Sequence, residues 1–363
     1  MDLWEYKEQT RIKHAILSNY LKRWMAILGR PRAGKPRKMH FVDSYAGRAR
    51  YKGGELGSPI LSMEVGEELY DHFGGAFFLE CHNVEVDAFN FRSLQWEVEV
   101  AKQDFPSVEV HNYQGSFEER VGEVFAKIQP GEPALVFLDP FGYQGIDMPL
   151  KMLERRYNEI FITFMSSFVN RFLTDPSKAP TMDRIFRTPS WRELRGTPNR
   201  QERLVRLYGE QIQLLAKQDL GLDEVLVYPI DVDFEGRNAD IYHLVHVSQH
   251  EAARKAMEDA VRDAKVLEHA QLPLSLGDDA VEERILEALD GEGRLPALRL
   301  AKKVWLRHEA ASWRDDVRGA VKALERRGEV VVTPHDGRNR KVGSLVREKD
   351  WVELRGGGQP RLA

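Results

Sequence analysis

The segment Met39-His-Phe-Val-Asp-Ser-Tyr-Ala-Gly47 joins a short apolar run to an acidic residue and several small residues. This pattern predicts a β-strand that ends near Asp43 and continues into a tight turn. Small residues let the backbone approach a ligand closely, and open α/β sheets bind ligands beyond the carboxyl ends of their strands. The residues predicted to contact a cofactor here are Asp43, Ala46 and Gly47.

Further apolar runs of strand length follow, and most are separated by sequences with helical periodicity. Strands are expected at 76–80, 108–113, 134–139, 159–164, 225–230 and 241–247. Such alternation predicts an α/β fold with a mostly parallel sheet covered by helices on both faces. Only a short polar stretch separates the last two strands, so they should pair antiparallel. Together with an amphipathic helix near the N-terminus, this is the Rossmann-like methyltransferase architecture, predicted over residues 1–270.

The pattern changes after a linker at 266–277 that contains proline and glycine. Three amphipathic segments then precede two short apolar runs, 330–334 and 342–347, which flank a polar stretch. Three helices followed by two strands and a wing predict a winged helix-turn-helix domain over residues 278–356. Its third helix and wing carry the basic residues predicted to contact nucleic acid, which are Arg314, Arg318, Lys322, Arg326, Arg338, Arg340 and Lys341. Winged helices that bind proteins are the alternative.

The charge distribution supports a polyanionic partner despite the net charge of −4 over 363 residues. Residues 1–50 carry a net +8 and residues 312–349 a net +4, whereas residues 51–311 carry −16. Basic ends flanking an acidic middle can present local positive patches to DNA or RNA. Solvated helix faces and terminal arms are the alternative explanation.

Composition excludes several classes of protein. A hydrophobic share of 42% is typical of globular chains, and the single cysteine, Cys81, rules out an intrachain disulfide and a zinc site made of thiolates. The histidines show neither HxxxH nor HExxH spacing, so no metal site is predicted. No apolar run approaches the length of a membrane span, and the first residues lack the apolar core of a signal peptide. A cytoplasmic location without membrane contact is expected.

Two further motifs are predicted to lie at the same edge of the sheet. Glu80 ends the predicted strand 76–80, where an acid accepts the ribose hydroxyls of a nucleotide-like cofactor. The triplet Asp139, Pro140 and Phe141 follows the most apolar strand. In this arrangement the Asp139 carboxylate and a backbone carbonyl accept the hydrogens of an exocyclic amine, while the Phe141 ring stacks on the base. The alternative is a plain Asp-Pro turn. Ser116, after the third strand, is placed near the adenine edge.

Two other patterns point to different chemistry. Residues 29–36, GRPRAGKP, fit a phosphate-binding loop except at Pro36, which replaces the required Ser or Thr, and they lie between a helix and a strand in the wrong order. Asp231, Asp233 and Glu235 alternate as magnesium ligands of a nuclease would, although a half-exposed strand or turn is the simpler interpretation.

Four segments together resemble a known family over roughly residues 1–265. They read KHAILSNYLKRWMAIL, FVDSYAGRARYKGGELGSPIL, VFLDPFG and IYHLVHVSQHEAARKAMEDAV, and they are similar to the three-Cys-motif partner (TcmP) family. The resemblance implies a fold similar to that of S-adenosylmethionine (SAM)-dependent methyltransferases, and a radical-SAM-like three-Cys-motif protein as partner. The family's glycine turn reads DxFAGxG, so Tyr45 replaces Phe and Ala49 replaces the last Gly. The DPFG motif is also similar to that of tRNA guanine N2-dimethyltransferases.

The sequence therefore predicts a methyltransferase-like protein that uses SAM to methylate an exocyclic base amine in DNA or RNA. Two alternatives stay open. The first is a catalytically silent nucleic-acid-binding partner in DNA repair, and the second is a metal-dependent nuclease.

Overall fold

The structure is a computed structural model, and its chain divides into two compact units, residues 1–270 and 271–363, each described here by itself. The residues described are 4–29, 36–146, 149–155, 157–230, 242–267, 282, 285–290, 293–297, 299–300, 316–343, 346 and 350–355.

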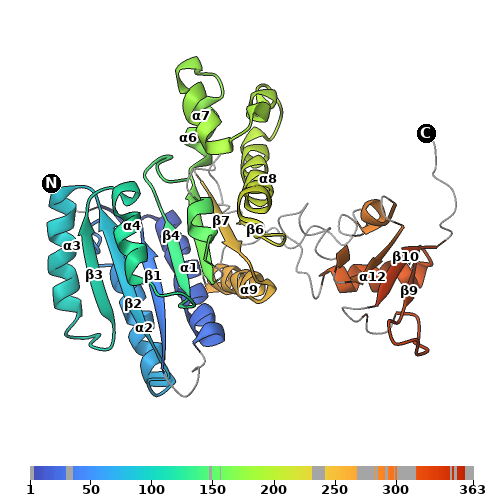
Figure 1. Ribbon diagram of the computed structural model, residues 1–363, viewed down its shortest axis with the longest axis horizontal. Coiled ribbons are helices and arrows are strands. Elements are labelled where there is room, and N and C mark those ends of the chain that lie inside the picture. Colours follow the sequence, from blue (N-terminus) through green and yellow to red (C-terminus); the bar gives the residue numbers. More distant parts are fainter. Residues whose placement is uncertain are drawn as a thin grey trace. The chain divides into compact units, whose positions relative to one another are not determined.

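The first unit is built on a seven-stranded sheet with the strand order β3-β2-β1-β4-β5-β7-β6 (Figure 1). The strands are β1 (Arg37–Asp43), β2 (Phe77–Glu85), β3 (Glu109–Gln114), β4 (Ala134–Leu138), β5 (Asn158–Phe164), β6 (Leu226–Ile230) and β7 (His243–Ser248). Strand β7 runs antiparallel to both of its neighbours, β5 and β6, and the other pairings are parallel. This topology confirms the predicted Rossmann-like methyltransferase fold, including the antiparallel closing strands.

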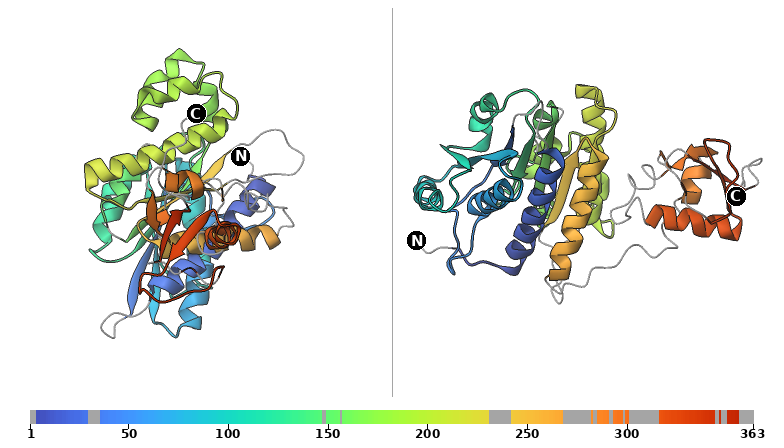
Figure 2. Two further views of the ribbon diagram at one scale, coloured as in Figure 1. Left: turned by 90° about the vertical axis from the view of Figure 1, so that its right-hand side faces the viewer. Right: turned by 90° about the horizontal axis from the view of Figure 1, so that it is seen from below.

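Helices cover both faces of this sheet (Figure 2). One row consists of α3 (Ala88–Ala101), α2 (Ser58–His72), α1 (Glu8–Leu28) and α9 (Glu251–Leu267). The opposite face carries α4 (Phe117–Lys127), α5 (Pro149–Leu153) and α8 (Arg200–Leu220). Alternate residues of a strand point to opposite faces, so a buried sheet needs apolar residues at consecutive positions. Strand β4 meets this requirement because all of its residues are buried.

Helix α1 begins at the carboxyl edge of the sheet and runs back toward the amino edge. Its apolar stripe packs against α9 and α2, as the helical period predicts. A buried polar contact fixes it to the sheet, and the same carboxylate also contacts a histidine of β7. The hydroxyl of Tyr20 donates to Glu159 of β5, and Nε2 of His246 in β7 lies 3.1 Å from the same carboxylate. An ion pair between Lys13 and Asp139 places the first turns of α1 beside the end of β4.

A helical insertion follows β5 at the carboxyl edge, which the sequence did not predict. It contains α6 (Ser166–Phe172), two 3₁₀ turns, η1 (Pro176–Lys178) and η2 (Pro189–Leu194), and α7 (Ala179–Phe186). Its core includes the buried side chains of Phe186 and Trp191. The rings of Tyr143 and Phe172 lie 5.2 Å apart, so α6 packs on the loop that follows β4.

The second unit contains α12 (Asp316–Arg327) and a three-stranded antiparallel sheet of the order β8-β10-β9. Its strands are β8 (Arg294–Pro296), β9 (Val330–Thr333) and β10 (Trp351–Leu354). The predicted strand at 342–347 is wrong, because residues 342–343 form a turn and β10 supplies the pairing partner of β9. Gly343 has a φ of +72°, which is incompatible with an extended strand. The winged helix-turn-helix assignment stays a prediction.

Within the described residues, no helix combines the length and the apolar composition needed to cross a bilayer.

Candidate active site

The turn after β1 lies against the end of β2. Gly47 has a φ of +63°, and its N–H donates to Oε2 of Glu85 at 2.8 Å. The N–H of Ala46 donates to the carbonyl of Val84 at 2.9 Å. Ala49 also has a positive φ, +67°, which is unfavourable for any residue with a Cβ. A glycine would adopt this conformation without strain, so Ala49 occupies a backbone position that favours glycine.

The acid at the end of β2 is Glu85, and the prediction that Glu80 occupies this place is wrong. Strand β2 continues for five residues beyond Glu80, which pairs in register with His40 in the middle of the sheet. The apolar run FFLE ends at Glu80, but the polar residues after it remain buried and extended. Glu85 is 7% exposed, and its Oε1 accepts the N–H of Asp87 at 2.7 Å. Glu85 therefore links the glycine turn to the start of α3.

Asp43 ends β1 in a fully buried position. Its Oδ1 accepts the N–H of Tyr45 at 3.3 Å, whereas Oδ2 has no hydrogen-bond partner among the described residues. Burial raises the pKa of Asp43 to about 7, although hydrogen bonding from Ser58 and Tyr45 lowers it in part. The negative charges of Asp139 and Glu85 raise it further. The pKa of Asp43 thus lies near neutrality, and the residue offers a buried polar oxygen at the edge of the sheet.

The triplet Asp139, Pro140 and Phe141 follows β4 directly, where the sequence placed it. The carboxylate of Asp139 forms an ion pair with Lys13 of α1, whose side chain is almost fully buried. Phe141 is 77% exposed, and its ring meets that of Trp4 edge-on at 5.2 Å. The loop after β4 therefore presents an exposed aromatic ring two residues beyond Asp139.

The N-terminal residues contribute to this site, and sequence analysis missed them. Trp4 lies on the glycine turn, because a Cβ built on Gly47 would approach its Cζ3 to 2.9 Å. Its carbonyl accepts the N–H of Lys52 at 2.9 Å. Trp4 therefore bridges the turn after β1 and Phe141. Aromatic residues ahead of a basic helix were the available signal.

A second aromatic group lies beneath this segment. The rings of Tyr6 and Tyr51 are 4.9 Å apart, and those of His14 and Tyr51 are 5.9 Å apart. The hydroxyl of Tyr6 lies 3.4 Å from Nδ1 of His14. Burial lowers the pKa of His14 to about 3, and the charge of Lys13 lowers it further. A neutral His14 leaves Lys13 as the cation that faces Asp139.

Ser116 lies two residues beyond the end of β3, where it caps α4. Its hydroxyl accepts the N–H of Glu119 at 3.3 Å, and the Glu119 carboxylate accepts the N–H of Ser116 at 3.1 Å. This capping box already engages the hydroxyl that the sequence assigned to the adenine edge. A ligand contact by Ser116 stays a prediction.

The predicted basic residues of the second unit differ in exposure. Lys322 is half-buried, and Arg326, Arg338 and Lys341 are exposed. Arg340 is not available at the surface, because its guanidinium forms a largely buried ion pair with Glu325 of α12. Its assignment to nucleic-acid contact is therefore corrected to a structural role. The other two predicted basic residues, Arg314 and Arg318, lie outside the described side chains. The same is true of the loop at 30–35 and of the possible nuclease ligands Asp231, Asp233 and Glu235.

No protein-family model matches the sequence, and no curated protein matches it. Among solved structures, the chain is similar to P. horikoshii TYW2, determined in a crystal structure in complex with MeSAdo. The sequence identity is 11% and the TM-score is 0.29, and the match covers 68% of this chain and 66% of that chain.

Proposed function

We propose that the first unit is a SAM-dependent methyltransferase that acts on an exocyclic amine of a nucleic-acid base. The observation that carries the proposal is the pairing of Glu85 with the Gly47 turn, next to Asp139 at the end of the adjacent strand β4. In Rossmann-like sheets, an acid at the second strand end and a glycine turn at the first form the nucleoside site. Glu85 thus takes the role in cofactor binding that the sequence suggested for Glu80.

The residues around the turn fit a nucleoside cofactor. Both oxygens of Glu85 accept backbone N–H groups, and each oxygen has a second lone pair that can accept a ribose hydroxyl. Asp43 presents the buried Oδ2 that lacks a partner among the described residues, which a ligand N–H or O–H would satisfy. SAM, when bound, supplies an electrophilic methyl group. Asp43, Gly47 and Glu85 would hold its nucleoside part beside β1 and β2.

Asp139 and Phe141 would orient the amine. The Asp139 carboxylate accepts the amine hydrogens, which directs the nitrogen lone pair toward the methyl group. Phe141 stacks on the base, and its exposure leaves a ring face accessible. Lys13 balances the charge of Asp139 in this largely buried setting. The reaction itself is the transfer of the methyl group from sulfur to nitrogen, after which the amine proton leaves to solvent.

The insertion after β5 supports a polyanionic substrate. Residues 166–200 carry seven basic and three acidic side chains, a net charge of +4 inside a chain segment that is acidic on average. Arg171, Arg187 and Arg195 are exposed there. Arg171 lies 4.3 Å from the Phe168 ring, so a cation and an aromatic face are presented together. Because the insertion follows the strand next to Asp139, it would bind phosphates that flank the target base.

The TcmP resemblance adds a partner to the proposal. It implies that a radical-SAM-like three-Cys-motif protein acts with this chain on its nucleic-acid target. The exposed basic residues of the second unit would, by their charge, contact phosphates.

The test is a calorimetric titration of the full chain with SAM. Binding by the wild type that is lost in Glu85→Ala, and retained in Glu55→Ala as the control at an exposed acid near the turn, supports the proposal. Absence of SAM binding by the wild type contradicts it. Methyl transfer from labelled SAM to bulk tRNA or to DNA, compared between wild type and Asp139→Asn, then tests the second step.

The ion pair between Lys13 and Asp139 favours a second candidate, because Lys13 already occupies an oxygen that the amine would use. In this case the first unit is catalytically silent and delivers nucleic acid to the partner. SAM titration and transfer would both fail, while binding to DNA or RNA would persist and weaken with salt. Charge reversal by Arg187→Glu would reduce that binding in either case.

A further inference from the structure

A cluster of histidine and acidic side chains crosses the sheet away from the candidate active site. Strands β1, β2 and β3 each carry a charged residue and a histidine two positions apart, which places each pair on one face of its strand. The parallel register sets His40 opposite Glu80 and His82 opposite His111. The pairs are Lys38 with His40, Glu80 with His82, and Glu109 with His111.

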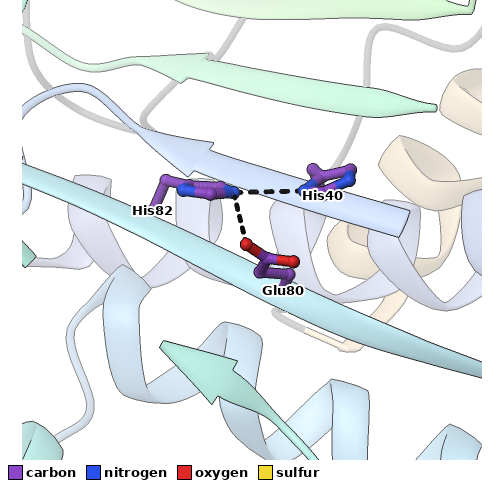
Figure 3. A group of neighbouring side chains, drawn as sticks. All are labelled: His40, Glu80 and His82. Carbon is purple, nitrogen blue, oxygen red and sulfur yellow. Dashed lines mark hydrogen bonds and ion pairs between the residues drawn. The ribbon is translucent and has the colours of Figure 1, made fainter. Parts of the chain in front are cut away.

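Three of these side chains converge in the interior of the first unit (Figure 3). Nδ1 of His40 lies 3.1 Å from Nε2 of His82, and the same Nε2 lies 3.6 Å from Oε1 of Glu80. Both histidines are fully buried and Glu80 is 3% exposed. A ligand atom from each lies within 4.8 Å of the other two.

These separations match a tetrahedral metal site. Zinc binds imidazole nitrogen and carboxylate oxygen at about 2.0–2.1 Å, so neighbouring ligand atoms of a tetrahedron lie roughly 3.3 Å apart. The two measured separations, 3.1 and 3.6 Å, fall on either side of this value. For these two pairs of ligand atoms, tetrahedral separations would need shifts of only a few tenths of an ångström, and the third pair lies within 4.8 Å.

The outer contacts of the cluster orient the same atoms inward. Nε2 of His40 donates to Oε2 of Glu132 at 2.9 Å, which leaves Nδ1 with a lone pair. Nδ1 of His82 lies 3.1 Å from the Tyr113 hydroxyl. A second ring nitrogen that contacts a carboxylate or hydroxyl is the usual outer arrangement around metal-binding histidines.

The carboxylate of Glu80 divides its contacts between its two oxygens. Oε2 pairs with Nζ of Lys38 at 2.6 Å, while Oε1 faces the histidines and lies 2.8 Å from Nε2 of His111. Glu80 is therefore a carboxylate with Oε1 turned toward the two buried imidazoles.

We propose that Nδ1 of His40, Nε2 of His82 and Oε1 of Glu80 bind a divalent transition-metal ion of the zinc class, with water in the fourth position. Two histidines, one carboxylate and a water form a known zinc ligand set. The side chains of His111 and Glu132, which contact Glu80 and His40, are partly exposed to solvent. The site joins β1 to β2 three residues before Asp43, roughly 10 Å from the candidate active site.

The test uses the full chain without a histidine tag, stripped with a chelator and then titrated with Zn²⁺ or Co²⁺ alone. We expect one ion per chain by calorimetry, a tetrahedral visible spectrum with Co²⁺, and a higher melting temperature when the ion is present. The variants His82→Gln and Glu80→Gln should abolish all three signals, and Glu132→Gln should weaken binding about 10–100-fold. His72→Gln, at an exposed histidine that ends α2, is the matched control and should bind as the wild type does.

Two results would show that the cluster is a hydrogen-bonded network without a metal ion. In the first, the wild type binds no stoichiometric ion; in the second, His82→Gln and Glu80→Gln bind the ion as the wild type does. Either result overturns the proposal. If these variants fail to fold by circular dichroism, X-ray absorption of the zinc-loaded wild type decides. Two imidazoles and oxygen around the ion support the site, whereas coordination without histidine overturns it. None of these measurements depends on SAM binding.

Discussion

Replacing Asp43 by asparagine should stabilise the protein in a pH-dependent way. The buried carboxyl has a pKa of about 7 against an ordinary value of 3.8, chiefly because burial disfavours its charged form. The native state therefore binds a proton more tightly than the unfolded chain between these two pH values. Stability contributed by the protonated acid is fully present below pH 3.8 and is lost as pH rises through 7.

The size of the stability change follows from the difference between the pKa of Asp43 in the native and unfolded states. A difference of about 3 pKa units corresponds to about 4 kcal/mol of unfolding free energy, lost at up to about 1.4 kcal/mol per pH unit. The asparagine side chain is an uncharged amide of similar shape, so the variant does not undergo this loss. The advantage of Asp43→Asn over the wild type should therefore grow from pH 4 to pH 7 and level off near pH 8.

Urea unfolding of the full chain at pH 4, 5, 6, 7 and 8, followed by circular dichroism, measures this difference. Other titrating groups cancel because wild type and variant share them. Asp104→Asn, at an exposed acid after α3, is the control and should track the wild type at every pH. A free-energy difference between Asp43→Asn and wild type that stays constant from pH 5 to pH 8 would refute the reasoning.

Three further predictions concern other parts of the chain. Burial raises the pKa of the Cys81 thiol to about 12, so iodoacetamide at pH 8 should label it in urea but not in the native protein, and rapid native labelling would contradict this. Arg340→Ala should cost about 3 kcal/mol in urea unfolding because it leaves Glu325 buried without its cation, whereas Arg338→Ala at an exposed site should change stability by less than about 0.5 kcal/mol. Gly47→Ala should cost at least about 1 kcal/mol from its positive φ alone, and a melting temperature equal to wild type would disprove the strain.

Much of the fold was readable from local patterns. Continuous apolar runs located the strands of the first unit within a few residues, and the short polar link between the last two predicted their antiparallel pairing. These features are local, because strand and helix periods depend on neighbouring residues only. The end of β2 was misplaced for the same reason. Residues 81–85 look polar in isolation, and only the packing of β1 and β3 on either side shows them to be buried strand.

Some features of the candidate site were also readable from local sequence, whereas others depend on tertiary contacts. The sequence alone determined the Asp43 turn and the Asp139 triplet, because each is a contiguous motif at the end of an apolar run. Only the tertiary structure brought Lys13 to Asp139 and Trp4 to Gly47, and only it assembled His40, Glu80 and His82 from separate strands. These contacts join residues distant in sequence, and the register between parallel strands is set by crossover connections that no single segment encodes.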